Sequence, residues 1–188
     1  MRLITVFLLF FTTLTFAQTY TVATVPNTKV VANSYVSDPD HLIHDTTIVA
    51  INNMLLDIEQ KSTAQVSVVL LTSIGDASEF DFAQELFKTW GIGKAAKDNG
   101  LLILYVRDKK VIRFHTGFGL EGVLTDAVCK QIQTRFMVPY FREGNVDRAM
   151  IAGIDEVSKL VNNPSYQKEI RDESSAVYRT DTSDQAAL

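Results

Sequence analysis

The sequence is 188 residues long, carries a formal net charge of −4 and is 46% hydrophobic. This length is sufficient for one domain with a substantial core and shorter flanking segments. The mildly acidic balance, with no basic stripe, argues against nucleic acid as a partner. A single cysteine, Cys129, excludes an internal disulfide framework and a clustered thiolate metal site.

Residues 1–17 have the pattern of a secretory signal peptide. A lone cation at Arg2 precedes an apolar run that only threonines interrupt, and the small residue Ala17 precedes the expected cut. The run is too short for a membrane-spanning helix, although an uncleaved anchor is the alternative. No later stretch of about 18 apolar residues follows. We therefore expect a periplasmic or secreted mature chain with no transmembrane anchor.

The rest of the chain divides into three parts. Residues 18–34 are polar and β-branched, which favours a linker with room for a short edge strand. Residues 35–163 form the expected domain, whose first residues make a turn because Pro39 disfavours a helical conformation at the residue before it. Residues 164–188 have few large apolar residues and mixed charge, which is typical of a disordered tail.

Four helices and three strands are expected in the domain, in the order α-β-α-β-β-α-α. Apolar residues at helical spacing, with polar capping residues before them, predict helices that begin near Asp45, Ser78, Thr125 and Asn145. The third of these bends or ends near Pro139. Short apolar or alternating runs predict strands over residues 65–71, 101–106 and 111–116.

This order predicts an α/β fold. It is a three-layer α/β/α sandwich, in which a small mixed sheet with a β-hairpin has helices on both faces. The helix between the first two strands implies a right-handed parallel crossover. The four-residue connection at 107–110 implies an antiparallel hairpin between the second and third strands.

Three acidic residues lie at the ends of the hairpin strands. Asp98 comes just before the second strand, and Glu121 and Asp126 come just after the third. Because a hairpin brings its outer ends to one edge of the sheet, we expect these carboxylates to converge. Calcium prefers several carboxylate and carbonyl oxygens, and glycines in residues 117–119 permit backbone carbonyls to turn inward. The alternative to a metal site is three separate structural roles. Asp98 would then form a turn, Glu121 would be solvated, and Asp126 would interact with the helix dipole from the first turn.

The remaining polar candidates give weaker signals. Asp38 precedes the first helix, and a parallel sheet would put it at the opposite edge from Asp98. His41 and His44 are best explained as surface residues, and His115 is an acid or base candidate only beside a phosphate. Cys129 has apolar neighbours and no assignable base, which favours a core thiol.

The motifs in order resemble those of the TPM-domain family, which is also described through thylakoid-lumen acid phosphatases. They are Val36-Ser37-Asp38, Thr63-Ala64-Gln65-Val66, Trp90-Gly91-Ile92-Gly93, Lys97-Asp98-Asn99-Gly100-Leu101-Leu102, Gly117-Phe118-Gly119-Leu120-Glu121-Gly122-Val123-Leu124-Thr125-Asp126 and Pro139-x-Phe141-Arg142-x-Gly144. The resemblance implies an exported α/β/α sandwich with a divalent-cation (calcium) site. The family's acidic positions correspond to Asp38, Asp98, Glu121 and Asp126.

The resemblance leaves two functions open. For some members it implies a weak acid phosphatase, in which a cation polarises phosphoryl oxygens and a bound water attacks. For others it implies a non-enzymatic role in maintaining membrane-protein complexes. No nucleophile or general base is specified by spacing. We therefore favour a monomeric calcium-binding module that acts through an envelope or membrane-protein partner, although the chain lacks the membrane helix and glycine-rich tail of many relatives.

Overall fold

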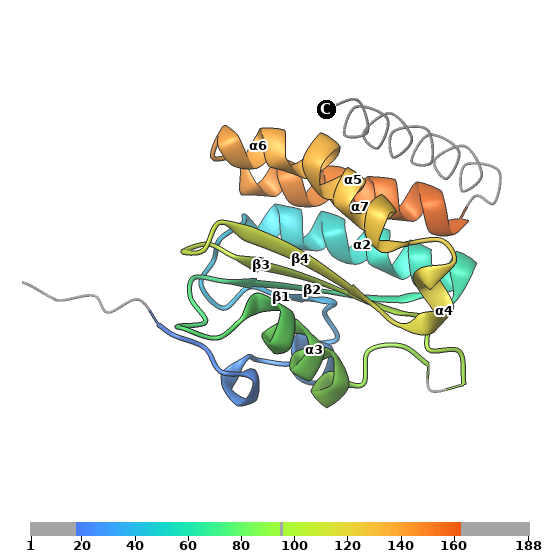
Figure 1. The fold of residues 1–188 in the computed structure, drawn as a ribbon, viewed down its shortest axis with the longest axis horizontal. Helices are drawn as coiled ribbons and strands as arrows, with labels where there is room; N and C mark the ends of the chain where they lie inside the picture. Colours follow the sequence, from blue (N-terminus) through green and yellow to red (C-terminus); the bar gives the residue numbers. More distant parts are fainter. Residues whose placement is uncertain (1–17, 95, 163–188) are drawn as a thin grey trace, which may run out of the picture.

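The computed structural model describes residues 18–94 and 96–162. The predicted signal peptide at 1–17 and the predicted tail at 164–188 lie outside the described residues. At the centre is a four-stranded mixed sheet in the order β1-β2-β3-β4 (Figure 1). Strands β1 (Val36–Ser37), β2 (Gln65–Leu71) and β3 (Gly100–Val106) run parallel, and β4 (Val111–Thr116) runs antiparallel to β3. The parallel crossover and the hairpin are thus confirmed, while β1 was not predicted.

Helices cover both faces of this sheet, which confirms the three-layer fold (Figure 1). One face carries α2 (Asp45–Ser62), α5 (Asp126–Ile132) and α7 (Val146–Asn162). The other face carries α3 (Glu79–Trp90) and the short helix η1 (Val22–Thr24). The remaining helical segments are α1 (Thr28–Ala32), α4 (Phe118–Glu121), the π-helical η2 (Gln133–Met137) and α6 (Val138–Arg142).

Strand β3 forms the centre of the core, and all seven of its residues are buried. Its side chains alternate between the two helical layers. Leu101 and Ile103 pack in the cluster that contains α2 and α7, and Leu102 and Leu104 pack in the cluster that contains α3. A strand covered on both faces needs apolar residues at every position. The continuous apolar run in the sequence is therefore explained by its central place.

The helix starts follow the expected capping chemistry with one exception. The Ser78 and Thr125 hydroxyls accept hydrogen bonds from the amides of Asp81 and Val128, and Asn145 accepts one from the Arg148 amide. These bonds satisfy amide groups that have no partner within their own helix. Asp45, however, is the first residue inside α2 rather than its cap. The third predicted helix is divided into α5, η2 and α6, with Pro139 in the first turn of α6.

The segment at 18–34, which we expected to be a linker, packs against the domain. Tyr20 is only 2% exposed, and its hydroxyl donates a 2.8 Å hydrogen bond to Asp40. Thr19 forms an isolated β-bridge with Ser73.

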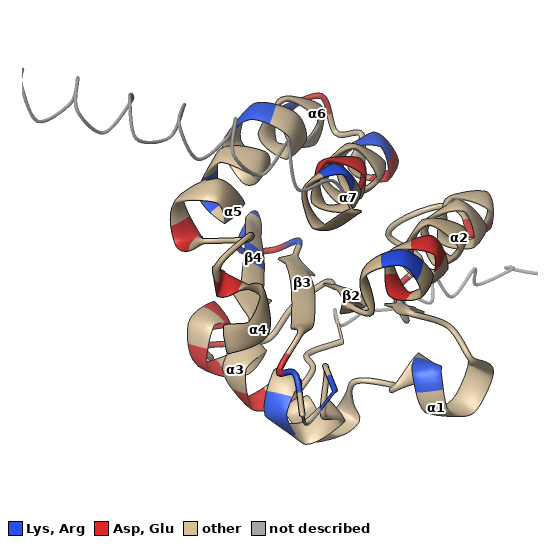
Figure 2. Ribbon diagram, turned by 90° about the vertical axis from the view of Figure 1, so that its right-hand side faces the viewer, with Lys and Arg blue, Asp and Glu red and all other residues tan. Residues whose placement is uncertain are grey.

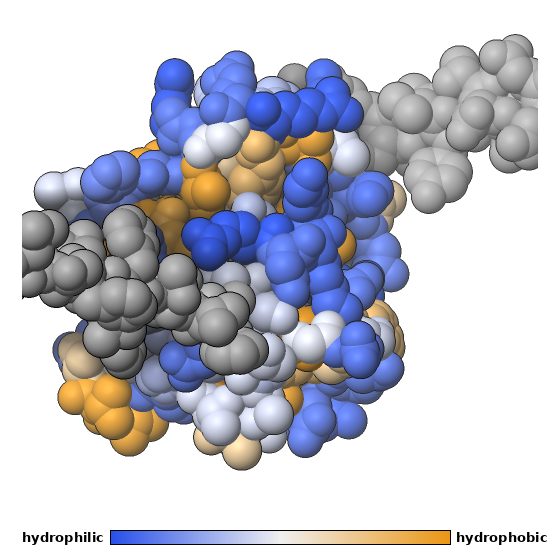
Figure 3. Space-filling view, turned by 90° about the vertical axis from the view of Figure 1, so that its left-hand side faces the viewer, coloured by the Kyte–Doolittle hydropathy of each residue, from blue (hydrophilic) through white to orange (hydrophobic). Residues whose placement is uncertain are grey.

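Within the described residues, no helix is both long and apolar enough to cross a membrane. The side of the molecule in Figure 3 is mainly hydrophilic, with hydrophobic surface in small separate patches.

Candidate functional site

The candidate site is built on two loops that meet at the end of the sheet where β3 begins and β4 ends. Asp98 lies in the first loop, with a left-handed backbone at φ +46°. Its Oδ2 accepts a 3.0 Å hydrogen bond from the Phe118 amide, and its carbonyl oxygen accepts one of 2.9 Å from the Gly119 amide. The expected approach of Asp98 to the glycine loop is therefore present.

The glycines of the second loop are required by this close approach. A Cβ atom at Gly117 would lie 2.6 Å from Asp98 Oδ1 and would also overlap the Asp98 carbonyl oxygen. A Cβ atom at Gly119 would overlap the carbonyl oxygen of Lys97. Three oxygens, namely the carbonyls of Lys97 and Asp98 and Asp98 Oδ1, thus surround the glycine segment. Such oxygens are the ligand type that hard cations prefer.

Asn99 holds the Asp98 loop in its strained conformation. Its Nδ2 donates to the carbonyl of Thr63 at 2.7 Å, and its Oδ1 accepts from the Lys94 amide at 3.1 Å. Thr63, at the end of α2, also has a left-handed backbone. Non-glycine residues in this region cost about 1–2 kcal/mol each and are kept by surrounding contacts. Our sequence reasoning missed Asn99, although an Asn-Gly pair before a strand is a recognisable turn signal.

The other two acids of the predicted trio occupy different places. Glu121 is exposed and ends α4, one helical turn after Phe118. Asp126 is exposed at the start of α5 and lines a separate hollow along β4. Within residues 18–94 and 96–162, no three His, Cys, Asp or Glu side chains lie close enough together to hold a metal ion. The structure therefore joins Asp98 to the glycine loop but does not gather three carboxylates.

Asp38 lies at the opposite end of the sheet. Continuing the register puts it level with Leu70 on β2, whereas Asp98 is level with Thr63, two residues before β2, so the two are roughly 23 Å apart along the strand direction. Its carboxylate accepts hydrogen bonds from the amides of Leu42 and Ile43 at 2.9 and 3.0 Å. Burial raises the pKa of Asp38, and these two bonds oppose that effect. Asp38 orders the turn before α2 and cannot share an ion with Asp98.

The other two candidates, Cys129 and His115, are packed against neighbouring residues of the fold. Burial raises the pKa of the Cys129 thiol to about 12, and its Sγ lies 3.6 Å from the Leu124 carbonyl oxygen, which confirms a core thiol. The His115 ring packs edge-on against Phe87 with centroids 4.9 Å apart. Burial, followed by the nearby cations Arg113 and Lys88, lowers the pKa of His115. A neutral imidazole is the result at physiological pH.

The comparisons with known proteins agree on one family. A family model described as the TPM domain matches residues 36–160, which is more than half of the chain. The solution structure of the N-terminal domain of a P. gingivalis protein is 35% identical and has a TM-score of 0.72. That match covers 77% of this chain and 93% of the P. gingivalis domain.

Two further solution structures show the same fold at lower identity. The BA42 protein of Bizionia argentinensis is 20% identical with a TM-score of 0.57, covering 66% of this chain and 84% of its own. The N-terminal domain of the cg2496 protein of Corynebacterium glutamicum is 18% identical with a TM-score of 0.56, covering 75% and 86%. A search of curated proteins gave no match. On the family match and the P. gingivalis likeness, the chain belongs to the TPM-domain family.

Proposed function

We propose that this TPM domain is an exported module that binds calcium at the Asp98 loop and uses the ordered loop to contact a partner protein. The observation that supports the proposal is the set of oxygens around the glycine segment. Asp98 supplies a carboxylate oxygen, Oδ1, that accepts no hydrogen bond from a described residue and lies against Gly117 together with the Asp98 carbonyl oxygen, while the Lys97 carbonyl oxygen lies against Gly119. A carbonyl that accepts one hydrogen bond keeps a second lone pair.

The residues that would hold the ion are Asp98, the Lys97 carbonyl and Glu121, which stands on the short helix that follows. Calcium takes six to eight oxygen ligands and readily completes its shell with water. When bound, it would neutralise acidic groups and fix the two loops against each other. The proposal leaves out Asp126, which lines the hollow along β4, and Asp38, which follows β1 at the other end of the sheet. The proposal thus narrows the four positions that the family resemblance implies.

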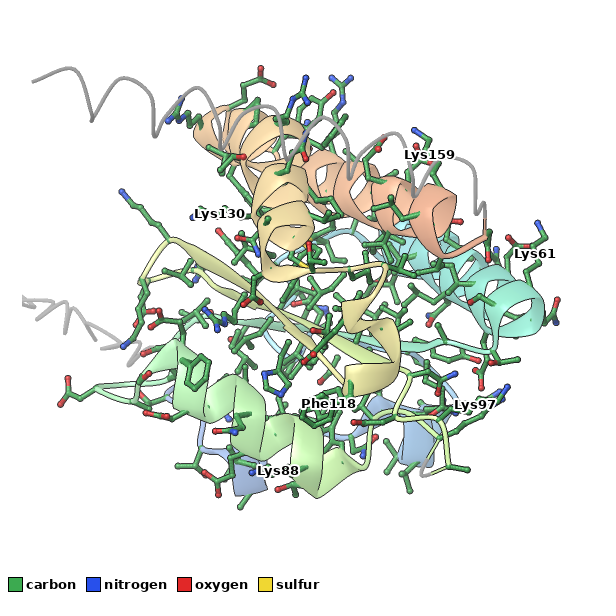
Figure 4. The ribbon with its side chains drawn as sticks, turned by 45° about the vertical axis from the view of Figure 1, so that its right-hand side comes forward. Lys61, Lys88, Lys97, Phe118, Lys130 and Lys159 are labelled. Atoms are coloured by element: carbon green, nitrogen blue, oxygen red, sulfur yellow. The ribbon has the colours of Figure 1, made fainter. Side chains whose placement is uncertain are left out.

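The contact with a partner would be made by Phe118. Phe118, which is labelled in Figure 4, is 80% exposed, although its amide donates a hydrogen bond to Asp98. Exposed aromatic residues on a fixed backbone are typical anchors of protein interfaces, because they bury a large apolar area at a small entropic cost. An ion that orders this loop would therefore regulate how Phe118 is presented. We expect the partner to be an envelope or membrane-protein complex.

Metal-assisted phosphatase activity is the second candidate function, and its support is the family's description alone. The buried Cys129 thiol, with a pKa of about 12, is unsuited to act as a nucleophile. The His115 ring packs edge-on against Phe87, and burial lowers its pKa. Hydrolysis of a chromogenic phosphate ester by the mature chain, lost on Asp98→Asn and retained on Asp126→Asn, would favour the enzyme.

Calcium is expected to raise the melting temperature of the mature chain, and Asp98→Asn is expected to abolish this rise. The neutral amide supplies less charge to the ion than the Asp98 carboxylate, whose Oδ1 lies against Gly117. An ion at 100 times its dissociation constant stabilises a protein by about 2.7 kcal/mol. Thermal scans with calcium and with a chelator measure the difference.

Asp126→Asn is the matched control, because Asp126 is exposed and lines a different hollow. It should keep the full calcium-dependent rise. A rise that survives in Asp98→Asn but disappears in Asp126→Asn would move the ion to the other hollow. The assignment to the Asp98 loop would then be wrong.

A further inference from the structure

Strand β4 is the last strand of the sheet, so one of its edges has no strand partner among the described residues (Figure 2). The Gly117 amide donates to the Gly100 carbonyl, which fixes the alternation of the antiparallel ladder. Hydrogen-bonded pairs alternate with non-bonded pairs, so Val111, Arg113 and His115 bond to β3. The backbone N–H and C=O groups of Ile112 and Phe114 consequently point outward.

A hollow of about 580 Å³ runs along this free edge. Its floor is residues 110–114, and its walls come from α5, η2 and the first residues of α3 and α6, with Ala127 and Val138 among the apolar lining residues. Proteins usually shield a sheet edge with a covering loop, a bulge or charged side chains. Here the edge lies at the bottom of a trough between two helical layers. The trough is suited to a single extended chain, because an extended chain is much narrower than a folded domain.

Arg113 supplies a second, independent observation. Its Nε is buried and has no hydrogen-bond partner among the described residues. The guanidinium lies 4.6 Å from the centroid of the Phe80 ring, which holds it in place. A buried donor without a partner costs about 1–3 kcal/mol. Arg113 also lines the trough, and a carboxylate is the ligand that matches a guanidinium best, so its charge favours an acidic group on whatever occupies the trough.

The charges around the trough agree with this choice. Lys110 and Lys130 line it together with Arg113, whereas Glu79 and Asp126 are its acidic lining residues. Lys130 stands on α5 above β4 (Figure 4). The basic groups are therefore in excess, and an acidic segment meets a complementary potential.

We propose that this trough binds an extended segment of a partner protein, which adds to β4 as a fifth strand and places a carboxylate against Arg113. Backbone bonds would form with Ile112 and Phe114, as in β-strand addition generally. Since side chains alternate along a strand, the two residues of the bound segment on either side of its acid face the opposite layer. Ala127 and Val138 line the trough on that side, so these two residues of the bound segment are expected to be apolar. The site is separate from the calcium loop and does not depend on it.

A second copy of this chain fits the trough less well. Antiparallel pairing of two β4 edges about a two-fold axis at Arg113, with Ile112 of one copy opposite Phe114 of the other, puts the two Arg113 residues directly opposite each other. Like charges directly opposite each other destabilise a strand pair. An acidic peptide does not meet this obstacle.

A fluorescein-labelled peptide, Ser-Thr-Val-Asp-Val-Thr-Ser, tests the proposal with the mature full-length chain. Fluorescence anisotropy should show saturable binding, and the amide resonances of Ile112 and Phe114 should shift in ¹H–¹⁵N spectra. A peptide with lysine in place of aspartate, and one with both valines N-methylated, should each bind at least about tenfold more weakly. The first loses the charge pair and the second loses the backbone bonds.

Protein variants test the same contact from the other side. Arg113→Glu should lose the aspartate peptide and gain the lysine peptide, and circular dichroism checks that the variant is folded. Lys88→Glu makes the same charge change on α3 outside the trough and should bind the aspartate peptide as before. Equal binding of the N-methylated peptide, no binding of the aspartate peptide, or a dimer that shifts the β4 amides would overturn the proposal. So would β4 amide shifts on removal of residues 163–188.

Discussion

Gly119→Ala is expected to lower the free energy of unfolding by about 1–3 kcal/mol and to remove the calcium-dependent rise in melting temperature. The added Cβ would overlap the Lys97 carbonyl oxygen and crowd the Asp98 carbonyl carbon. Both neighbours are backbone atoms, which cannot turn away as a flexible side chain can. The loops must separate, which breaks the hydrogen bond between the Gly119 amide and Asp98. Urea unfolding, followed with and without calcium, measures both effects.

Gly122→Ala is the matched control. It lies three residues further along, with a helical backbone at φ −69°, and a Cβ there would meet nothing within 4 Å. Alanine at such a site is neutral or stabilising by up to about 1 kcal/mol, because it restricts the unfolded chain. Equal stability of the two variants would show that the loops are not in contact as described. Loss of stability in Gly119→Ala with full calcium stabilisation would separate the fold of the loop from ion binding.

The sheet could be predicted well because its strands carry strong local signals. The apolar run at 65–71 and the alternating run at 111–116 match β2 and β4 at both ends. Each run is long enough for its pattern to be distinctive, and turn residues bound it. Strand β1 is two residues long, Val36 and Ser37, and pairs only through its place beside β2. No periodicity can be recognised in a segment of that length.

The site could be predicted only in part, because topology places residues at an edge without setting their depth or direction. The hairpin argument brought Asp98 to residues 117–119 correctly. It could not show that α4 would form there or that α5 would carry Asp126 over the β4 edge. The topology argued against the inclusion of Asp38 that the family resemblance implies. A parallel first pair of strands puts Asp38 and Asp98 at opposite ends of the sheet. The register bears out that topological argument.

The packing of the segment at 18–34 could not be foreseen, because its anchors are tertiary contacts between distant residues. Tyr20 donates to Asp40 Oδ1, and Asp40 Oδ2 accepts from the Thr72 amide just after β2. Ser37 donates its hydroxyl proton to the carbonyl of Pro26. A polar, β-branched composition favours a linker when these partners are unknown. The buried Tyr20 side chain and its hydrogen bond to Asp40 show that the segment packs against the domain.

Asp40→Ala is therefore expected to destabilise the domain, by about 1–3 kcal/mol for each buried group that it leaves without a partner. Those groups are the Tyr20 hydroxyl and the Thr72 amide, which both lie 2.8 Å from the carboxylate. Tyr20→Phe, which removes one donor from the partly exposed Asp40 carboxylate, should cost less, about 1 kcal/mol, because water can replace that donor. Urea unfolding of the three proteins at pH 7 gives the comparison.

The same contact predicts a dependence on pH. Burial raises the pKa of Asp40, but the hydrogen bonds from Thr72 and Tyr20 and the charge of Arg107 outweigh it, so the pKa is lowered. An acid with a lowered folded-state pKa stabilises the fold above its unfolded-state pKa, which is about 3.9. This stabilisation is lost as the pH falls through the folded-state pKa. The difference in stability between the original chain and Asp40→Ala should accordingly be full at pH 7 and shrink in strong acid. A difference that stays constant with pH would mean that Asp40 acts by its shape rather than its charge.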